Sequence, residues 1–352
     1  MLIIALCLAV YVGAIGAETA REALRACRAA MKTGSGTERP NAGVHCMTSS
    51  TTNSAATHAA QSNYYRPGRL MRALRLGLTT SQRVWPALGV RAAHRLFGTP
   101  LPLKWLYRAQ APGAGWRREG WSFENASLGL YHLATQDSGA ESAPVVLLVH
   151  GWGGHAGQMV ALAEAVAHAG LRPVLLELPA HGRSAGMMSN SPQFARAISY
   201  VVARLVADGH ALRAAVAHSM GANALGLAAA QGLRAERLVL LAPPASAREY
   251  TRYFAHTFGL SEATRLAMQR LFEAQEGILM AQLEPAAVGP RIAQPTLIVH
   301  DRDDRVNRFA DAEAYRDAIK GAQLVATQGL GHRRILKEEE VLRQVARFLA
   351  QP

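Results

Sequence analysis

The 352-residue chain contains 38 Lys+Arg, 25 Asp+Glu and three Cys, and 49% of its residues are hydrophobic. This composition supplies enough apolar side chains for a substantial core, which excludes wholesale disorder. The length suits one large domain or two small ones. The only long apolar run extends from Leu2 to Ile15, which excludes a protein with many membrane spans.

The net charge of +13 is carried almost entirely by the first third of the chain. Residues 1–120 hold 16 Lys+Arg against 4 Asp+Glu, whereas residues 121–352 hold 22 against 21. Because the second part is near-neutral and the first is poor in aromatic residues, the sequence indicates no nucleic-acid partner. All three cysteines lie before residue 50, which excludes a cysteine nucleophile in the rest of the chain.

The first 63 residues have the composition of a leader and a linker. Residues 1–17 resemble the apolar part of a signal peptide but lack the usual preceding positive charge. Residues 32–63 are rich in Ser, Thr, Asn and Gly and are expected to be disordered. If this leader is genuine, the protein is exported or membrane-anchored. The alternative is an over-long gene start, with translation beginning at Met47 or Met71 and a cytoplasmic protein.

Residues 64–115 are predicted to form a basic helical extension. Over residues 66–78, leucines recur every four residues and arginines occupy the other helix faces; these residues are Leu70, Leu74 and Leu78, with Arg69, Arg72 and Arg75. A basic amphipathic helix of this kind usually packs its apolar stripe on a neighbouring domain. Peripheral contact with an anionic membrane is the alternative interpretation.

From residue 116 onward, strand-like and helix-like segments alternate. Residues 121–123 and 128–132 predict an antiparallel pair, and the continuous apolar run 145–150 is typical of a strand buried on both faces. The predicted strands of this sheet are 145–150, 173–178, 212–218, 237–241, 296–300 and 323–327. The predicted helices are 158–169, 192–207, 221–231, 308–320 and 337–349. The alternation predicts an α/β domain over 116–352, with a mostly parallel sheet and helices on both faces.

Residues 245–290 interrupt this alternation with a helical insert. Aromatic side chains share one face of its first helix, at Tyr250, Tyr253, Phe254 and Phe258. We interpret the insert as a small lid over the carboxyl ends of the strands, where ligands bind in such sheets. In that interpretation Tyr250, Phe254 and Phe258 line the substrate pocket. An ordinary helical subdomain with its own core is the alternative.

The segment Ala217-His218-Ser219-Met220-Gly221 lies between a predicted strand and a predicted helix. Small residues on both sides of Ser219 permit a sharp, strained turn that lifts its hydroxyl to the edge of the sheet. A serine that merely caps the helix is the alternative. The segment resembles the G-x-S-x-G nucleophile elbow of the α/β-hydrolase family, with Ala217 in place of the first glycine.

A second segment, His150-Gly151-Trp152-Gly153-Gly154, resembles the HG-x-x-G loop of the same family. The resemblance implies that the backbone N–H groups of Trp152 and Met220 form an oxyanion hole. It also implies that His150, Gly151 and His218 lie near the substrate. The alternative is a glycine-rich turn that leads into a helix. Neither G-x-x-x-x-G-K-[ST] nor G-x-G-x-x-G occurs here, so a phosphate cradle is not indicated.

Two later segments supply an acid and a base in the chain order of the family. The loop 300–306 resembles an HG-x-x-D pattern whose acid corresponds to Asp304, with Asp301 in the glycine position. Asp303 in the same loop is expected to face solvent. His332 follows the last predicted strand, at the position of the family's base. The resemblance therefore implies a triad in which Ser219 attacks, His332 transfers the proton and Asp304 orients the imidazole.

A fourth segment, Glu177 to Ser184, resembles the family's D-x-P-G-H-G-x-S turn, with Glu for Asp and Ala for the first Gly. We expect it to be a structural turn near the pocket. His181 within it is not the predicted base, because it precedes Ser219 and lies in a different loop.

The resemblance covers residues 121–352 and implies an α/β-hydrolase fold with a small helical lid insert. It implies a serine hydrolase that cleaves a small carboxylic ester or thioester through an acyl-enzyme. Acyl transfer by the same triad, or a non-catalytic binding protein on the same scaffold, are the alternatives. The histidines are scattered and show no metal-ligand spacing, so neither a metal nor another cofactor is predicted. The sequence does not define the oligomeric state.

Overall fold

The computed structural model describes residues 68–101, 104, 110–134 and 143–351. The predicted leader and linker, residues 1–63, lie outside this part of the chain. Among the described residues, none of the helices is both long enough and apolar enough to cross a membrane.

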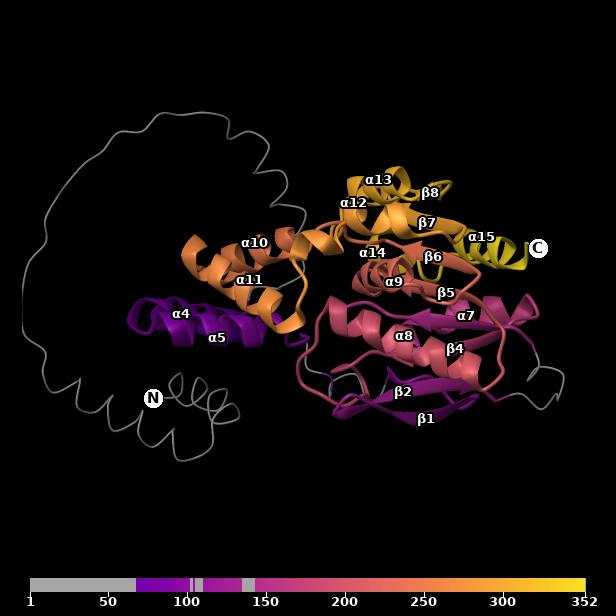
Figure 1. Cartoon of the computed structure of the whole chain (residues 1–352), viewed down its shortest axis with the longest axis horizontal. Helices are drawn as coiled ribbons and strands as arrows, with labels where there is room; N and C mark the ends of the chain where they lie inside the picture. The colour runs from indigo at the N-terminus through magenta and orange to yellow at the C-terminus, as the bar shows by residue number, and fades with distance from the viewer. Residues whose placement is uncertain (1–67, 102–103, 105–109, 135–142, 352) are drawn as a thin grey trace, which may run out of the picture.

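An eight-stranded sheet forms the centre of the molecule, in the order β1-β2-β4-β3-β5-β6-β7-β8 (Figure 1). The strands are β1 (Trp116–Phe123), β2 (Ala126–Leu133), β3 (Val145–Val149), β4 (Arg172–Glu177), β5 (Leu212–His218), β6 (Arg237–Leu241), β7 (Thr296–Asp301) and β8 (Gln323–Thr327). The β1–β2 and β2–β4 pairs are antiparallel, and the other neighbouring pairs are parallel. The mostly parallel sheet predicted from the alternation is confirmed.

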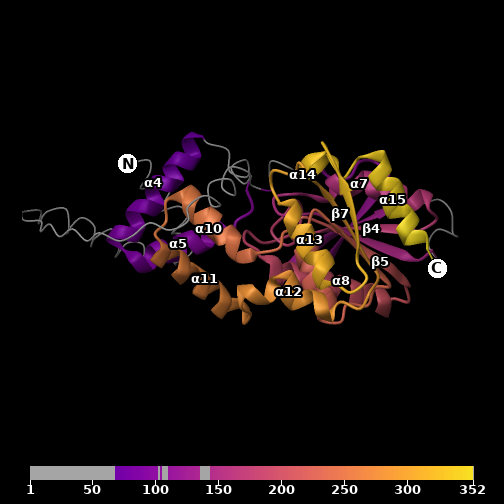
Figure 2. The same ribbon diagram turned by 90° about the horizontal axis from the view of Figure 1, so that it is seen from above.

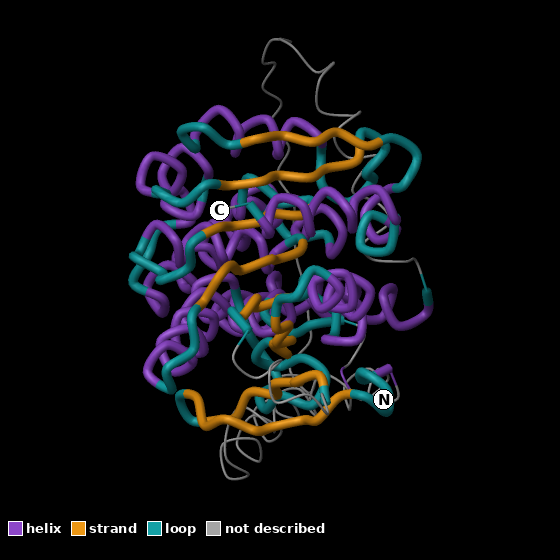
Figure 3. Tube along the Cα trace, turned by 90° about the vertical axis from the view of Figure 1, so that its right-hand side faces the viewer, coloured by secondary structure: helices purple, strands orange, loops and turns teal. Residues whose placement is uncertain are grey.

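Helices cover both faces of this sheet (Figure 3). Two of them, α7 (Val160–His168) and α15 (Glu339–Ala350), pack on one face. The opposite face carries α8 (Ser191–Ala207), α9 (Met220–Ala230) and α13 (Phe309–Ala318). Because strand side chains alternate between faces, β3 contributes to both cores, and all five of its residues are buried.

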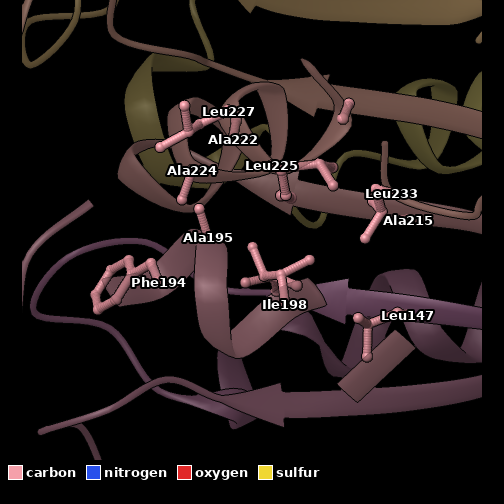
Figure 4. Packing of buried hydrophobic residues seen from close by; sticks show 14 of the residues in the cluster. Leu147, Phe194, Ala195, Ile198, Ala215, Ala222, Ala224, Leu225, Leu227 and Leu233 are labelled. Atoms are coloured by element: carbon pink, nitrogen blue, oxygen red, sulfur yellow. The ribbon is translucent and has the colours of Figure 1, made fainter. Parts of the chain in front are cut away.

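Small and branched side chains fill the second of these cores (Figure 4). Phe194 and Ile198 of α8 and Leu225 of α9 belong to the same buried cluster as Leu147 of β3 and Ala215 of β5. Alanines along α9 allow this helix to lie close to α8 and the sheet, and nine of its eleven residues are buried. The helix that follows Ser219 is therefore held rigidly, which fixes the position of the serine.

The strand order creates a switch point at the carboxyl ends of β3 and β5. After β3 the chain moves to β4 on one side, and it later returns to β5 on the other side. Ligands bind at such reversals, because the two loops diverge and leave a crevice between them. Gly151 follows β3 and Ser219 follows β5, so two of the predicted motifs meet at this point.

Element boundaries differ from the sequence predictions mainly at the ends. A four-residue helix that the sequence did not predict, α14 (Gly331–Arg334), carries His332. The predicted helix at 158–169 begins as a 3-10 turn, η2 (Ala156–Met159). The basic helix is longer than expected, at Arg69–Val84 (α4), and a second helix, α5 (Pro86–Phe97), starts at Pro86. Proline suits a first helical turn because its missing N–H has no partner there.

Four helices form a layer beside the sheet, which we call the helical cover (Figures 1 and 2). It consists of α4 and α5 together with α10 (Ala247–Phe258) and α11 (Glu262–Glu276) of the insert. The insert continues through η3 (Met280–Leu283), α12 (Pro285–Val288) and η4 (Gly289–Arg291) back to β7. The cover has its own core, made of Leu78, Ala93, Phe254, Phe258 and Met268.

Two residues predicted to line a substrate pocket lie instead in this cover core. Phe254 and Phe258 are 1% and 0% exposed, and Phe254 makes an edge contact with Phe97 of α5 at 5.3 Å between ring centroids. The insert alone would leave this aromatic face exposed, but α4 and α5 bury it. The sequence did not show that two separate segments share one core.

Candidate active site

Ser219 stands at the turn between β5 and α9 with a strained backbone. Its φ of 54° and ψ of −128° lie in a region that costs a non-glycine residue on the order of 1–3 kcal/mol. Although Ser219 occupies the N-cap position of α9, its side chain makes no capping hydrogen bond. The capping alternative therefore does not describe this serine, and its hydroxyl is directed elsewhere.

Two glycines allow the loops around Ser219 to approach each other. A Cβ at Gly221 would lie 2.3 Å from the carbonyl oxygen of His150, and one at Gly151 would lie 2.8 Å from the Ser219 Cβ. Neither distance is possible for real side chains. Glycine at both positions is thus what brings the HGWGG loop against the serine.

His332 connects Ser219 to Asp304. Its Nε2 lies 3.0 Å from the Ser219 Oγ, and its Nδ1 lies 2.7 Å from the Asp304 Oδ2. The Asp304 side chain is fully buried, and the Ser219 residue is 9% exposed. Three side chains from three separate loops, after β5, β7 and β8, therefore form one chain of hydrogen bonds.

The surroundings of Asp304 favour its carboxylate form. Burial alone would raise the pKa of Asp304, but hydrogen bonds from His300 and His332 outweigh this effect and hold the pKa well below its ordinary value. The backbone N–H groups of Val306 and Asn307 also donate to its Oδ1, at 2.7 and 3.1 Å. A carboxylate so held is a fixed acceptor for the Nδ1–H of His332.

Asp301 shapes the loop that carries His332. Its two carboxylate oxygens accept hydrogen bonds from the backbone N–H groups of Leu330 and Gly331, at 3.0 and 2.9 Å, and from the Thr327 hydroxyl at 2.8 Å. Burial opposes ionisation, but these donors keep the pKa of Asp301 below its ordinary value. The sequence placed Asp301 in a glycine position without assigning it this role. Asp303, expected to face solvent, is exposed.

His218, directly before the serine, contacts both the ring and the backbone of His332. Its ring centroid lies 4.6 Å from that of His332, and its Nε2 lies 2.9 Å from the His332 carbonyl oxygen. Burial, together with the nearby His332, keeps the pKa of His218 well below its ordinary value. A neutral His218 therefore donates its Nε2–H to that carbonyl and ties the His332 loop to the elbow.

Two buried histidines join the HGWGG loop to the turn after β4. His181 accepts a hydrogen bond from the Gly153 N–H at Nε2, at 2.9 Å, and its Nδ1 lies 2.8 Å from the Pro179 carbonyl oxygen. His150 accepts from the Leu178 N–H at Nε2, at 3.1 Å. Burial lowers the pKa of His150 to about 4 and that of His181 well below its ordinary value. Both histidines are therefore neutral acceptors at neutral pH.

Glu177 is buried beneath the same loop and accepts hydrogen bonds at both carboxylate oxygens. The Ala156 N–H lies 3.2 Å from Oε1, and the Arg183 N–H lies 2.8 Å from Oε2, which also accepts from the Tyr131 hydroxyl at 3.0 Å. A Cβ at Gly182, where φ is +45°, would lie 2.0 Å from this carboxylate. The turn 177–184 thus supports the HGWGG loop, and the sequence missed the contribution of Glu177.

The remaining predicted residues lie close to these groups. Met220 begins α9, and the first N–H groups of a helix have no partner within it. Trp152 follows Gly151, and its ring contacts His181 and Phe194 at 5.4 and 5.9 Å between centroids. The Tyr250 hydroxyl donates to Asn307, next to the loop of Asp304, so Tyr250 connects the cover to the site. Among the residues that the structure describes, no group of acidic, histidine or cysteine side chains has the arrangement of a metal site.

Comparison with known proteins agrees with the fold described above. Residues 140–277 match a family model described as serine aminopeptidase, S33. The chain resembles a putative lipase from Acinetobacter baumannii (TM-score 0.51, 18% identity, 71% of this chain and 96% of that one). It also resembles the Pyrococcus furiosus esterase Pf2001 (TM-score 0.52, 18% identity, 66% and 89%).

A third solved structure, a serine hydrolase from a Cycloclasticus bacterium, covers 66% of this chain and 98% of its own, with a TM-score of 0.50 and 16% identity. None of the curated proteins is similar enough in sequence to count as a match. The chain has the α/β-hydrolase fold.

Proposed function

We propose that this α/β-hydrolase is a serine hydrolase that cleaves a carboxylic ester or thioester through an acyl-enzyme. The observation that carries the proposal is the unbroken hydrogen-bond chain from Ser219 through His332 to the buried Asp304. The strained turn at Ser219 supports it, because such strain persists at sites where a side chain must be presented in one orientation.

In the proposed reaction, Ser219 Oγ attacks the acyl carbon while its proton passes to His332 Nε2. Asp304 accepts the Nδ1–H of His332 and stabilises the imidazolium that forms. When the tetrahedral intermediate collapses, His332 returns the proton to the departing alkoxide or thiolate, which leaves Ser219 acylated. A water molecule then attacks the acyl carbon and gives a proton to His332. When this second tetrahedral intermediate collapses, His332 returns the proton to the Ser219 Oγ, and the carboxylic acid leaves.

The oxyanion donors in this proposal are the backbone N–H groups of Trp152 and Met220. Support comes from the contact of Gly151 with Ser219 and from the position of Met220 at the start of α9. Removing one such donor typically lowers the rate about 10²- to 10³-fold. The buried histidines and Glu177 keep the first of the two loops in place, so the donors need not reorganise during the reaction.

The test is labelling of the full chain with a fluorophosphonate, read by intact mass. This reagent reports an activated serine and does not require the natural substrate. One adduct is expected on the wild-type protein and on Ser122→Ala, an exposed serine of β1, and none on Ser219→Ala. An adduct that persists in Ser219→Ala, or no adduct on folded wild-type protein, would refute the proposal and leave a binding role on the same scaffold.

A substrate panel then separates the related reactions. Acyl esters and acyl thioesters are expected to be hydrolysed, whereas amino-acid anilides test the peptidase activity named by the matching family model. Preferential turnover of the anilides would replace the ester assignment. Adding alcohol acceptors tests acyl transfer: if transfer product exceeds free acid at low acceptor concentration, the protein is an acyltransferase that uses the same triad.

A further inference from the structure

The α4–α5 pair carries positive charge and has no acidic residue of its own. Residues 69–97 contain six arginines and neither Asp nor Glu; the arginines are Arg69, Arg72, Arg75, Arg83, Arg91 and Arg95. The ion pairs among the described residues all use arginines or histidines from other elements. The pair therefore presents a local positive field, although the hydrolase domain is near-neutral.

Helix α4 has two distinct faces. Its inner stripe of Met71, Leu74 and Leu78 packs into the core of the helical cover. Its outer stripe, at helical spacing, is exposed and consists of Arg69, Arg72, Leu76, Thr80 and Arg83. The apolar stripe predicted from the sequence is already buried in the core of the helical cover, so this packing does not explain the exposed outer stripe.

Large apolar side chains are exposed among these arginines. Leu76 is 54% exposed, Leu70 is 55% exposed, and the turn between the helices presents Val84 and Trp85 at 55% and 51%. They make up four of the six large hydrophobic side chains that are more than half exposed in the described part of the chain. A tryptophan with an apolar body and a polar N–H suits the boundary between lipid and water. Long arginine side chains beside it reach lipid phosphates while their stems lie on apolar surface.

We propose that the outer face of the α4–α5 pair is a docking surface for a bilayer that contains anionic phospholipids. The arginines attract the negative surface, and Leu76, Val84 and Trp85 enter the headgroup region. A nucleic acid would also attract arginines, but its phosphates offer no site for exposed leucine and valine side chains. The mixture of positive charge and exposed apolar surface therefore favours a lipid bilayer over a nucleic acid as the partner.

This surface is attached directly to the insert. The Arg75 guanidinium donates to the Thr257 carbonyl oxygen at 3.0 Å, and the Gln82 side chain donates to the Gly259 carbonyl oxygen at 2.9 Å and accepts from the Ser261 N–H at 2.9 Å. These bonds fix α4 to the turn between α10 and α11. A bilayer that holds α4 therefore also holds the insert, whose Tyr250 contacts the loop of Asp304.

The test is cosedimentation of the full chain with vesicles of phosphatidylcholine alone or with about 30% phosphatidylglycerol, at 50 and 500 mM NaCl. Binding is expected only to the anionic vesicles, with a loss at high salt because salt screens exposed charges. Each arginine at an anionic surface raises the binding constant roughly fivefold. The triple variant Arg69→Gln, Arg72→Gln, Arg83→Gln should therefore bind at least tenfold more weakly, and Trp85→Ser severalfold more weakly.

A matched control removes the same charge from the far end of the molecule, with Arg234→Gln, Arg343→Gln and Arg347→Gln, two of which lie on α15 (Figure 1). This variant should bind like the wild type. An equal loss of vesicle binding in both triple variants would show that only net charge matters. No loss of binding in either variant would show that the α4–α5 pair does not bind the vesicle. Either result would overturn the proposal. Binding to a DNA duplex but not to vesicles would also overturn it.

Two further measurements separate this result from the hydrolase assignment. Ser219→Ala should bind vesicles as the wild type does, and the Arg69/Arg72/Arg83 variant should keep its fluorophosphonate adduct in vesicle-free solution. All substituted side chains in the pair are exposed, so thermal unfolding should show unchanged midpoints. The docking surface can thus fail its test while the triad passes, or the reverse.

Discussion

The loops of the proposed active site and the helical cover lie next to each other but are stabilised by different interactions. The loops after β3, β5, β7 and β8 are held by buried carboxylates and neutral histidines that bond to backbone N–H and C=O groups. The cover is held mainly by an apolar core between two segments far apart in the sequence. Hydrogen bonds fix distances and directions, whereas apolar contacts fix mainly proximity. The difference indicates that precise positioning is concentrated at the loops where we propose that proton transfer takes place.

The largest expected effect tests the fixed geometry of the loops. Asp304→Asn should lower kcat about 10⁴-fold, because an amide no longer favours the His332 tautomer that accepts a proton from Ser219. The measurement is ester hydrolysis under saturating substrate. Asp317→Asn, an exposed change on α13, should leave kcat unchanged. A loss of less than tenfold in Asp304→Asn would show that His332 does not depend on this carboxylate.

The next effect concerns the support beneath the HGWGG loop. In Glu177→Gln, one amide oxygen replaces two carboxylate oxygens, so either the Ala156 or the Arg183 N–H loses its acceptor. We expect kcat to fall about 10- to 100-fold through displacement of the oxyanion donors, with a smaller change in KM. The unsatisfied group should also cost about 1–3 kcal/mol in unfolding free energy. Glu164→Gln, exposed on α7, is the matched control, and equal kinetics for the two variants would contradict this role.

Substitutions in the core of the helical cover should change the unfolding free energy of the protein rather than the reactivity of Ser219. Leu78→Ala removes a side chain that is 6% exposed and should lower the unfolding free energy by about 2–4 kcal/mol. Leu76→Ala, two residues earlier but 54% exposed, should change it by less than about 0.5 kcal/mol. Urea unfolding measures both, and fluorophosphonate labelling at low urea should proceed within a few-fold of wild type. Loss of labelling in Leu78→Ala would show that the cover and the loops behave as one unit.

The smallest expected effect is a dependence of stability on pH. His150 takes up a proton in the unfolded chain below about pH 6.5, but in the folded protein only near pH 4. The unfolded state therefore binds more protons between these values, so stability is present above pH 6.5 and decreases as pH falls. His150 alone should lower the unfolding free energy by about 2 kcal/mol between pH 7 and 5. Urea midpoints at pH 7, 6 and 5 measure the slope, and an unchanged slope in His150→Gln would argue against this assignment.

The sequence by itself predicted the sheet, its flanking helices and the order of the four motifs. In a continuous apolar run such as 145–149, side chains on both faces of the strand must be buried. This is typical of a parallel sheet that is covered by helices on each side. Small residues around Ser219 and the positions of Asp304 and His332 after successive strands reflect local chain geometry. Local backbone geometry depends on residues that are close in the sequence, so a sequence pattern can predict it.

Only the tertiary structure decided which distant groups meet. The roles of Glu177, His181 and Asp301 depend on which backbone N–H groups other loops bring to them, and no spacing in the chain encodes those partners. The same holds for Phe254 and Phe258, whose aromatic face is covered by α4 and α5 from more than 150 residues earlier. An amphipathic stripe shows that a side chain will be buried but not what will bury it. That choice is made by the fold, through the free energy of packing the whole chain at once.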